Sequence, residues 1–68
     1  MSNRVKAPGL CKCLQALTQN GIISAAKAGE CVKAYMNDDV SILVEIVNSK
    51  DTPVAMLPLM QPLRQFIQ

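Results

Sequence analysis

The chain has 68 residues, half of them hydrophobic, and its seven basic and five acidic residues give a net charge of +2. This length permits one domain with a small core, and domains of this size usually depend on disulfides, metals or partners for stability. The mild charge argues against a strongly electrostatic nucleic-acid binder, and the lack of histidine excludes Ser/His and Cys/His nucleophilic catalysis.

Residues 1–7 are polar and basic and are predicted to form a flexible arm, which leaves residues 8–68 as a single domain. Three basic residues near the N-terminus are candidates for contact with RNA phosphates, with a solvated terminus as the alternative: Arg4, Lys6 and Lys12. No apolar signal-peptide segment and no membrane-spanning stretch is visible. Together with three cysteines, this predicts a cytoplasmic or other reducing intracellular compartment.

Leucines recur at i, i+4 and i+7 after the break at Pro8-Gly9, which is the spacing of a short amphipathic helix. They are Leu10, Leu14 and Leu17. Asn20-Gly21 predicts a left-handed end to this helix. Residues 21–24 contain a β-branched pair and are predicted as either a short strand or the entry turn of the next helix.

Residues 25–37 predict the clearest helix, because alanines supply helix propensity and Ser24 is suited to be its N-cap. Gly29 costs about 1 kcal/mol relative to alanine in a helix interior, so it is expected to mark a close approach by another backbone or a ligand. The apolar face is predicted to hold Ala28, Cys31, Val32, Tyr35 and Met36. The polar face is predicted to hold Lys27, Glu30, Lys33 and Asn37.

Residues 40–47 form the most apolar run of the chain and fit two structures. As a helix, they place Ser41 and Glu45 on a polar stripe behind a cap at Asp38 or Asp39. As a strand, they place β-branched residues on one whole face. Eight residues with five Val or Ile, bounded by polar segments, favour the strand.

Residues 48–52 are predicted to form a loop, and Thr52-Pro53 is predicted to begin a last helix with Thr52 as its N-cap. Pro58 and Pro62 are expected to kink this helix. Its apolar stripe is either part of the core or a surface that enters a partner's groove. The candidate partner-binding residues are Met56, Leu59, Met60, Leu63 and Phe66.

Three cysteines and no histidine do not match a structural zinc site, which takes four ligands. Cys13 and Cys31 are predicted to be buried small hydrophobic residues, and Cys11 to be exposed. No metal or other cofactor is expected. The carboxylates show no spacing for paired acid–base work, so the chain is predicted not to be an enzyme, and no small-molecule substrate is expected.

Four stretches between residues 17 and 63 occur in a characteristic order. They are Leu17 to Ile22, Glu30 to Ala34, Ile42 to Ile46, and the polar loop Asn48 to Asp51 followed by Pro53. In this order they resemble the family of ribosomal and small-nucleolar RNP proteins that bind kink-turn RNA. That family opens a helix with a Gly-x-Asn-Glu motif and places a lysine one turn later. Here Glu30 and Lys33 match, whereas Lys27 and Gly29 occupy the glycine and asparagine positions.

The resemblance implies an α/β fold, a small truncated helix-strand-helix-strand-helix unit, with an all-α bundle of three or four helices as the alternative. A two-stranded sheet is not stable alone, so RNA or another protein subunit is expected to cover it. The implied function is a structural component of a ribosome or other ribonucleoprotein. The alternative is a helical protein–protein interaction or oligomerisation module that uses the C-terminal apolar helix. The resemblance implies Lys27, Gly29, Glu30 and Lys33 as RNA-binding residues, and the basic N-terminus adds Arg4, Lys6 and Lys12.

Overall fold

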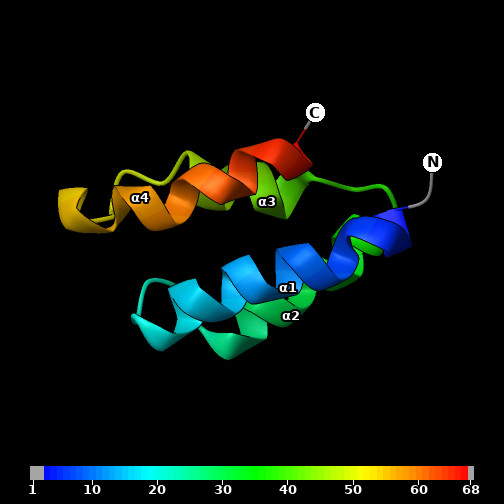
Figure 1. Cartoon of the computed structure of the whole chain (residues 1–68), viewed down its shortest axis with the longest axis horizontal. Coiled ribbons are helices and arrows are strands. Elements are labelled where there is room, and N and C mark those ends of the chain that lie inside the picture. Colours follow the sequence, from blue (N-terminus) through cyan, green and yellow to red (C-terminus); the bar gives the residue numbers. More distant parts are fainter. Residues whose placement is uncertain (1–2, 68) are drawn as a thin grey trace.

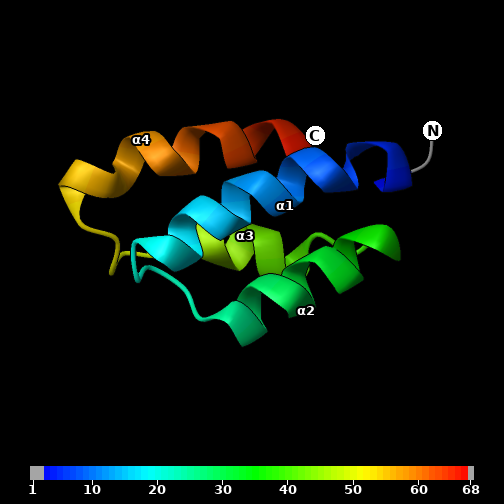
Figure 2. The ribbon, with the colours of Figure 1, turned by 60° about the horizontal axis from the view of Figure 1, so that its bottom comes forward.

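Helices stacked in two layers make up the fold in a computed structural model, which describes residues 3–67 (Figure 1). One layer holds α1 and α2, and the other holds α3 together with α4 and a following 3-10 helix. The elements are α1 (Asn3–Gln19), α2 (Ala25–Met36), α3 (Ser41–Val47), η1 (Val54–Met56), α4 (Leu57–Met60) and η2 (Gln61–Phe66). Figure 2 shows α4 and η2 running alongside α1, while α3 lies beside α2.

The predicted α/β class is wrong, since residues 3–67 contain no strand, and the all-α alternative describes the fold. Residues 40–47, predicted as a strand, lie almost wholly in α3. A helix brings Leu43, Ile46 and Val47 to one buried face at i, i+3 and i+4, whereas the strand pattern would have buried Val44, which is only half-buried. Burial of this face outweighs the modest β preference of the branched side chains.

The turn after α1 is a Schellman motif rather than the short strand considered for residues 21–24. The N–H of Gly21 bonds to the carbonyl of Thr18 at 3.0 Å, and the N–H of Ile22 bonds to that of Leu17 at 3.0 Å. Gly21 has φ of 72°, which confirms the predicted left-handed helix end. Ser24 is the N-cap of α2, as predicted, and its hydroxyl accepts from the N–H of Lys27 at 3.0 Å.

The end of α2 repeats the same motif without glycine. The N–H of Asp38 bonds to the carbonyl of Tyr35, and the N–H of Asp39 bonds to that of Ala34, both at 3.0 Å. Asp38 therefore has φ of 62°, a conformation that aspartate tolerates better than most residues. A Schellman motif therefore forms both the turn before α2 and the turn after it.

Two glycine substitutions are expected to have opposite effects on stability. A Cβ at Gly21 or at Gly29 would meet nothing within 4 Å, but only Gly21 has a positive φ. Gly21→Ala is therefore expected to lower the free energy of unfolding by about 1 kcal/mol, and Gly29→Ala to raise it by up to about 1 kcal/mol. Urea denaturation followed by circular dichroism measures both. Shifts of the same sign would contradict this description of the two backbones.

The first helix begins earlier than the sequence predicts. A break was expected at Pro8-Gly9, yet α1 runs from Asn3 through Pro8, and Ala7 is already buried. Pro8 falls in the second turn, where its missing N–H removes one i→i−4 hydrogen bond from α1. Most of the predicted arm is therefore helical, and positions 1–2 of that arm lie outside the described residues.

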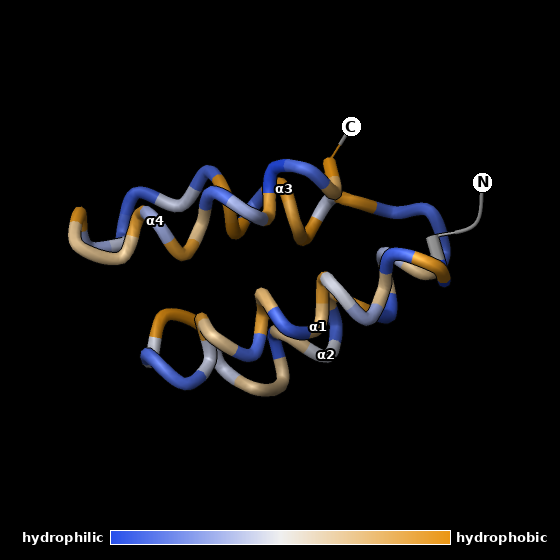
Figure 3. The backbone as a smooth tube through the Cα atoms, in the orientation of Figure 1, coloured by the Kyte–Doolittle hydropathy of each residue, from blue (hydrophilic) through white to orange (hydrophobic). Residues whose placement is uncertain are grey.

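The core lies between the two layers and is mainly aliphatic. Tyr35 and Phe66 form its aromatic contact, with ring centroids 5.9 Å apart and ring planes at 89°. Phe66 also lies over Gly9, where a Cβ would come within 3.4 Å of its ring. The amphipathic spacing appears in Figure 3 as hydrophobic and hydrophilic residues alternating along each helix. No helix within residues 3–67 has the length and hydropathy needed to cross a membrane.

The stability of the α2–α3 connection is expected to depend on pH. The Asp39 carboxylate accepts bonds from the hydroxyl of Ser41 and, at 2.9 Å, from its backbone N–H, and these bonds lower the pKa of Asp39 below its ordinary value of 3.8. A depressed pKa in the folded state stabilises the fold above pH 3.8, and this contribution is lost as the pH falls below that value. Asp39→Asn is therefore expected to lower the melting temperature at pH 7 but hardly at about pH 2. An equal decrease at both pH values would contradict this assignment.

Candidate functional site

An apolar groove with a volume of about 630 Å³ runs along the line where α1 meets α2. All the residues that line it belong to these two helices. Among the described residues, none from the second layer lines the groove, so it opens away from that layer. Its walls include Cys11, Gln15 and Thr18 from α1 and Ala25, Gly29 and Met36 from α2. The α1–α2 pair is thus covered by helices on one side and bare on the other.

Small side chains leave the groove open. Ala25, Ala28 and Gly29 occupy adjacent turns of α2, and a Cβ at Gly29 would meet no atom of the chain within 4 Å. The close approach expected at Gly29 is therefore not made by any described part of this chain. Met36 lies at the far end of the groove and is 43% exposed, which is high for a large hydrophobic side chain.

Charge is divided unequally between the two layers. The α1–α2 layer carries five basic residues and one acidic residue, a net charge of +4. The rest of the chain carries two basic and four acidic residues, a net charge of −2. α1 contributes three of the basic residues and no acidic one. Among the residues that line the groove, only Lys33 is charged.

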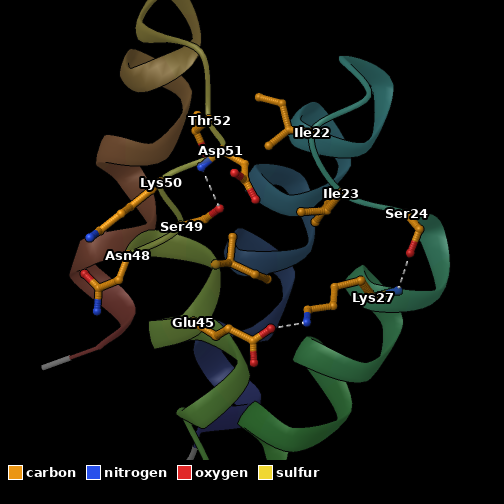
Figure 4. Close-up of a pocket in the computed structure, with 11 residues that line it drawn as sticks. Ile22, Ile23, Ser24, Lys27, Glu45, Asn48, Ser49, Lys50, Asp51 and Thr52 are labelled. Carbon is orange, nitrogen blue, oxygen red and sulfur yellow. Dashed lines mark hydrogen bonds and ion pairs between the residues drawn. The ribbon is translucent and has the colours of Figure 1, made fainter.

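A second concavity, of about 610 Å³, is polar and lies between the turn before α2 and the loop after α3 (Figure 4). Lys27 and Glu45 form an ion pair across it that ties α2 to α3. The hydrogen bond to Glu45 raises the pKa of Lys27 above its ordinary value of 10.5. The Ser49 hydroxyl accepts from the N–H of Asp51 at 3.3 Å. These two interactions therefore join polar groups that line this cleft to one another.

The predicted RNA-binding residues all lie on α1 or α2 but do not line one concavity. Gly29 and Lys33 line the apolar groove, and Lys27 lines the polar cleft. Lys6 lines a smaller cleft of about 320 Å³ beside the end of η2. The remaining three are exposed and line neither the groove nor these clefts: Arg4, Lys12 and Glu30.

The predicted partner-binding stripe packs within the chain. Met60, Leu63 and Phe66 are 4%, 0% and 7% exposed and belong to the core cluster. Met56 and Leu59 are half-buried. Since the second layer uses this stripe to cover α1, the stripe is not a free surface in this structure.

The cysteines differ in their surroundings. Cys31 is buried, Cys13 is half-buried and Cys11 is exposed on the groove wall. Burial raises the pKa of the Cys13 and Cys31 thiols, which keeps both protonated at neutral pH. Within the part of the chain that the structure describes, no three potential ligands among His, Cys, Asp and Glu lie close enough to hold a metal ion.

The sequence did carry a signal for the groove, which the search for single motifs missed. The apolar or small residues of α2 cover more than the one stripe that a single neighbour needs. Ala25, Ala28, Val32 and Met36 recur at i, i+3, i+7 and i+11 beside the stripe that ends in Tyr35. Within the described residues, α2 packs against both α1 and α3, and the stripe from Ala25 to Met36 lies along the groove.

No family model, curated protein or solved structure matches this chain. These comparisons neither support nor refute the resemblance to kink-turn RNA-binding proteins. The resemblance includes residues 42–46 as a strand, whereas in the structure these residues belong to the helix α3.

Proposed function

We propose that this protein is a non-catalytic interaction module that binds an amphipathic helix of a partner protein in the α1–α2 groove. The supporting observation is the groove itself: about 630 Å³ of open, mainly apolar space on the side of α1 and α2 that the second layer does not cover. An apolar groove between two helices is the usual receptor for the apolar face of a third helix.

The dimensions of the groove suit a helix. The lining residues of α2 run from Ala25 to Met36, which at 1.5 Å per residue corresponds to about 17 Å or three helical turns. The small side chains at Ala25, Ala28 and Gly29 allow another backbone to approach closely. Met36 at one end offers a flexible apolar contact that adapts to different side chains.

A second copy of the chain suits this groove less well. Two copies that met groove to groove would bring the Lys33 ammonium groups of both copies into one interface, because Lys33 is the one charged residue that lines the groove. Like charges in an interface oppose association. The proposed occupant is therefore a different chain.

A larger side chain at Gly29 is expected to weaken peptide binding without lowering the free energy of unfolding. Gly29→Gln is expected to raise the free energy of unfolding by roughly 0.5 kcal/mol, because glutamine is the better helix former and meets no atom of the chain. The same side chain projects into the groove, so the affinity for a docked helix is expected to fall at least tenfold. Ala26→Gln is the matched control, since Ala26 is exposed on the same helix and does not line the groove.

The probe is a fluorescent peptide of about 15 residues, helical, with leucines at i, i+3, i+4 and i+7 and glutamines elsewhere on its flanks. Fluorescence anisotropy with the full chain measures its affinity for wild type and both variants. The proposal expects loss of binding for Gly29→Gln alone. It is overturned if Gly29→Gln and Ala26→Gln bind the peptide as well as wild type does, or if the wild-type chain does not bind it.

A further inference from the structure

We infer that Thr52 is a phosphorylation site for a proline-directed protein kinase, an enzyme that modifies a hydroxyl group followed by proline. The inference does not rest on the proposed function, because Thr52 lies in the loop between α3 and η1 and does not line the α1–α2 groove. It derives from the state of the Thr52 hydroxyl, the exposure of the loop and the proline at the next position.

The hydroxyl of Thr52 forms no hydrogen bond to any other residue in the range 3–67. Hydrogen bonds engage every other aliphatic hydroxyl in that range, on Thr18, Ser24, Ser41 and Ser49. Within the described residues, no side-chain oxygen is both buried and without a partner, so the Thr52 oxygen is accessible to solvent although the residue is half-buried. This oxygen is therefore available as an acceptor.

The sequence predicted Thr52 as the N-cap of the last helix, and this prediction is wrong. Pro53 is the N-cap of η1, and no side chain forms a capping hydrogen bond there. The cause is the backbone of Pro53, whose φ of −59° and ψ of 144° are those of an extended polyproline II segment rather than of a first helical turn. The Thr52 hydroxyl thus has no capping role that a modification would remove.

The segment around Thr52 is open to an enzyme. Residues 48–55 are all exposed except Thr52 itself, and residues 48–53 belong to no helix. Figure 4 shows Thr52 where the loop after α3 leaves the polar cleft. Exposed loops are the parts of a folded chain that enzymes reach most readily. A kinase can therefore take up this segment without unfolding a helix.

Pro53 gives the site its class. Thr52 is the one Ser or Thr of the chain that precedes a proline. An enzyme pocket that offers no acceptor for the next backbone N–H favours proline, because proline has no N–H to leave unsatisfied. Ser49 is followed by Lys50, which keeps its N–H, so the same pocket disfavours Ser49.

The co-substrate is ATP, which the kinase binds with Mg²⁺. The Oγ1 atom of Thr52 forms a bond to the γ-phosphorus, the bond from that phosphorus to the β-phosphate oxygen breaks, and ADP leaves with the electron pair. The hydroxyl proton passes to the catalytic aspartate of the kinase. The phosphate adds about −1.5 to −2 charges at pH 7. The residues outside the α1–α2 layer carry a net charge of −2, so their negative charge about doubles.

The test is phosphorylation of the folded full chain by a purified mitogen-activated protein kinase with Mg-ATP. Intact-mass spectrometry counts the phosphoryl groups added, and fragmentation locates them. Wild type is expected to gain one phosphoryl group, on Thr52. Pro53→Ala is expected to slow the modification at least about tenfold. Pro58→Ala is the matched control, since Pro58 is exposed but follows leucine, and it leaves the rate unchanged.

Two further variants assign the acceptor, and circular dichroism verifies that they keep their helices. Thr52→Val removes the hydroxyl with little change in shape, and Ser49→Ala removes the nearest other one. The inference is upheld if Thr52→Val abolishes the modification and Ser49→Ala does not. It is overturned if wild type gains no phosphoryl group, if the group is found only on another residue, or if Pro53→Ala is modified as fast as wild type.

Discussion

Leu63→Ala is expected to lower the free energy of unfolding by about 2–5 kcal/mol, because a fully buried leucine leaves a cavity that a small core refills only in part. Leu63 is 0% exposed and lies in η2, the 3-10 segment that packs on α1 and α3. A 68-residue domain has only about 3–10 kcal/mol of stability in all, at roughly 0.05–0.15 kcal/mol per residue. The variant is thus expected to lose a large part of its stability and to unfold at a lower urea concentration than wild type.

Leu57→Ala is the matched control for this substitution. Leu57 belongs to the same C-terminal region but is 45% exposed, so its loss is expected to change stability by about 0.5 kcal/mol or less. Urea denaturation followed at 222 nm compares the two variants with wild type. If Leu63→Ala and Leu57→Ala unfolded at the same urea concentration, the C-terminal segment would not be packed against α1 as described.

Leu43→Ala is expected to cost about 2–5 kcal/mol, whereas Val44→Ala is expected to cost about 0.5 kcal/mol or less. Leu43 is 1% exposed at the centre of the buried face of α3, and Val44 lies outside the core cluster. Alanine at position 44 also has a better helix propensity than valine, which offsets part of any lost contact.

The contrast between positions 43 and 44 discriminates helix from strand. In a strand over residues 40–47, Val44 would share one face with Ile42 and Ile46, and Leu43 would lie on the opposite face with Glu45. Thermal denaturation of the two single variants reports which position is buried. A larger loss for Val44→Ala than for Leu43→Ala would contradict the helical structure of this segment.

Local signals in the sequence predicted much of the first half of the fold. The leucines of α1, the glycine that ends it and the serine that begins α2 act through neighbouring residues, and each has the predicted role. The prediction for the α3 segment was wrong because five Val or Ile in eight residues favour a strand locally. Whether the segment follows the two-residue period of a strand or the 3.6-residue period of a helix depends on which of its side chains meet the core. That choice is made by α2 and η2, the elements that α3 contacts, and η2 is distant in sequence.

The candidate site was harder to predict than the fold. Lys33 and Gly29 were singled out for contact with RNA, and both line the groove, but the groove exists only because α1 and α2 pack side by side. Cys11, Thr18 and Ala25 have no motif that marks them in the sequence. The C-terminal stripe was correctly recognised as apolar, yet whether it was a core or a contact surface depended on α1 being available to cover it.

Chemical-shift mapping tests helix docking in the groove most directly. Amide shifts of the ¹⁵N-labelled chain are recorded while the helical peptide with the leucine stripe is added to saturation. The proposed function predicts that the largest shifts occur at groove residues on both helices, with Cys11, Thr18, Gly29 and Met36 among them. Shifts confined to residues 53–58, or no shifts at saturating peptide, would show that the groove is not the binding surface.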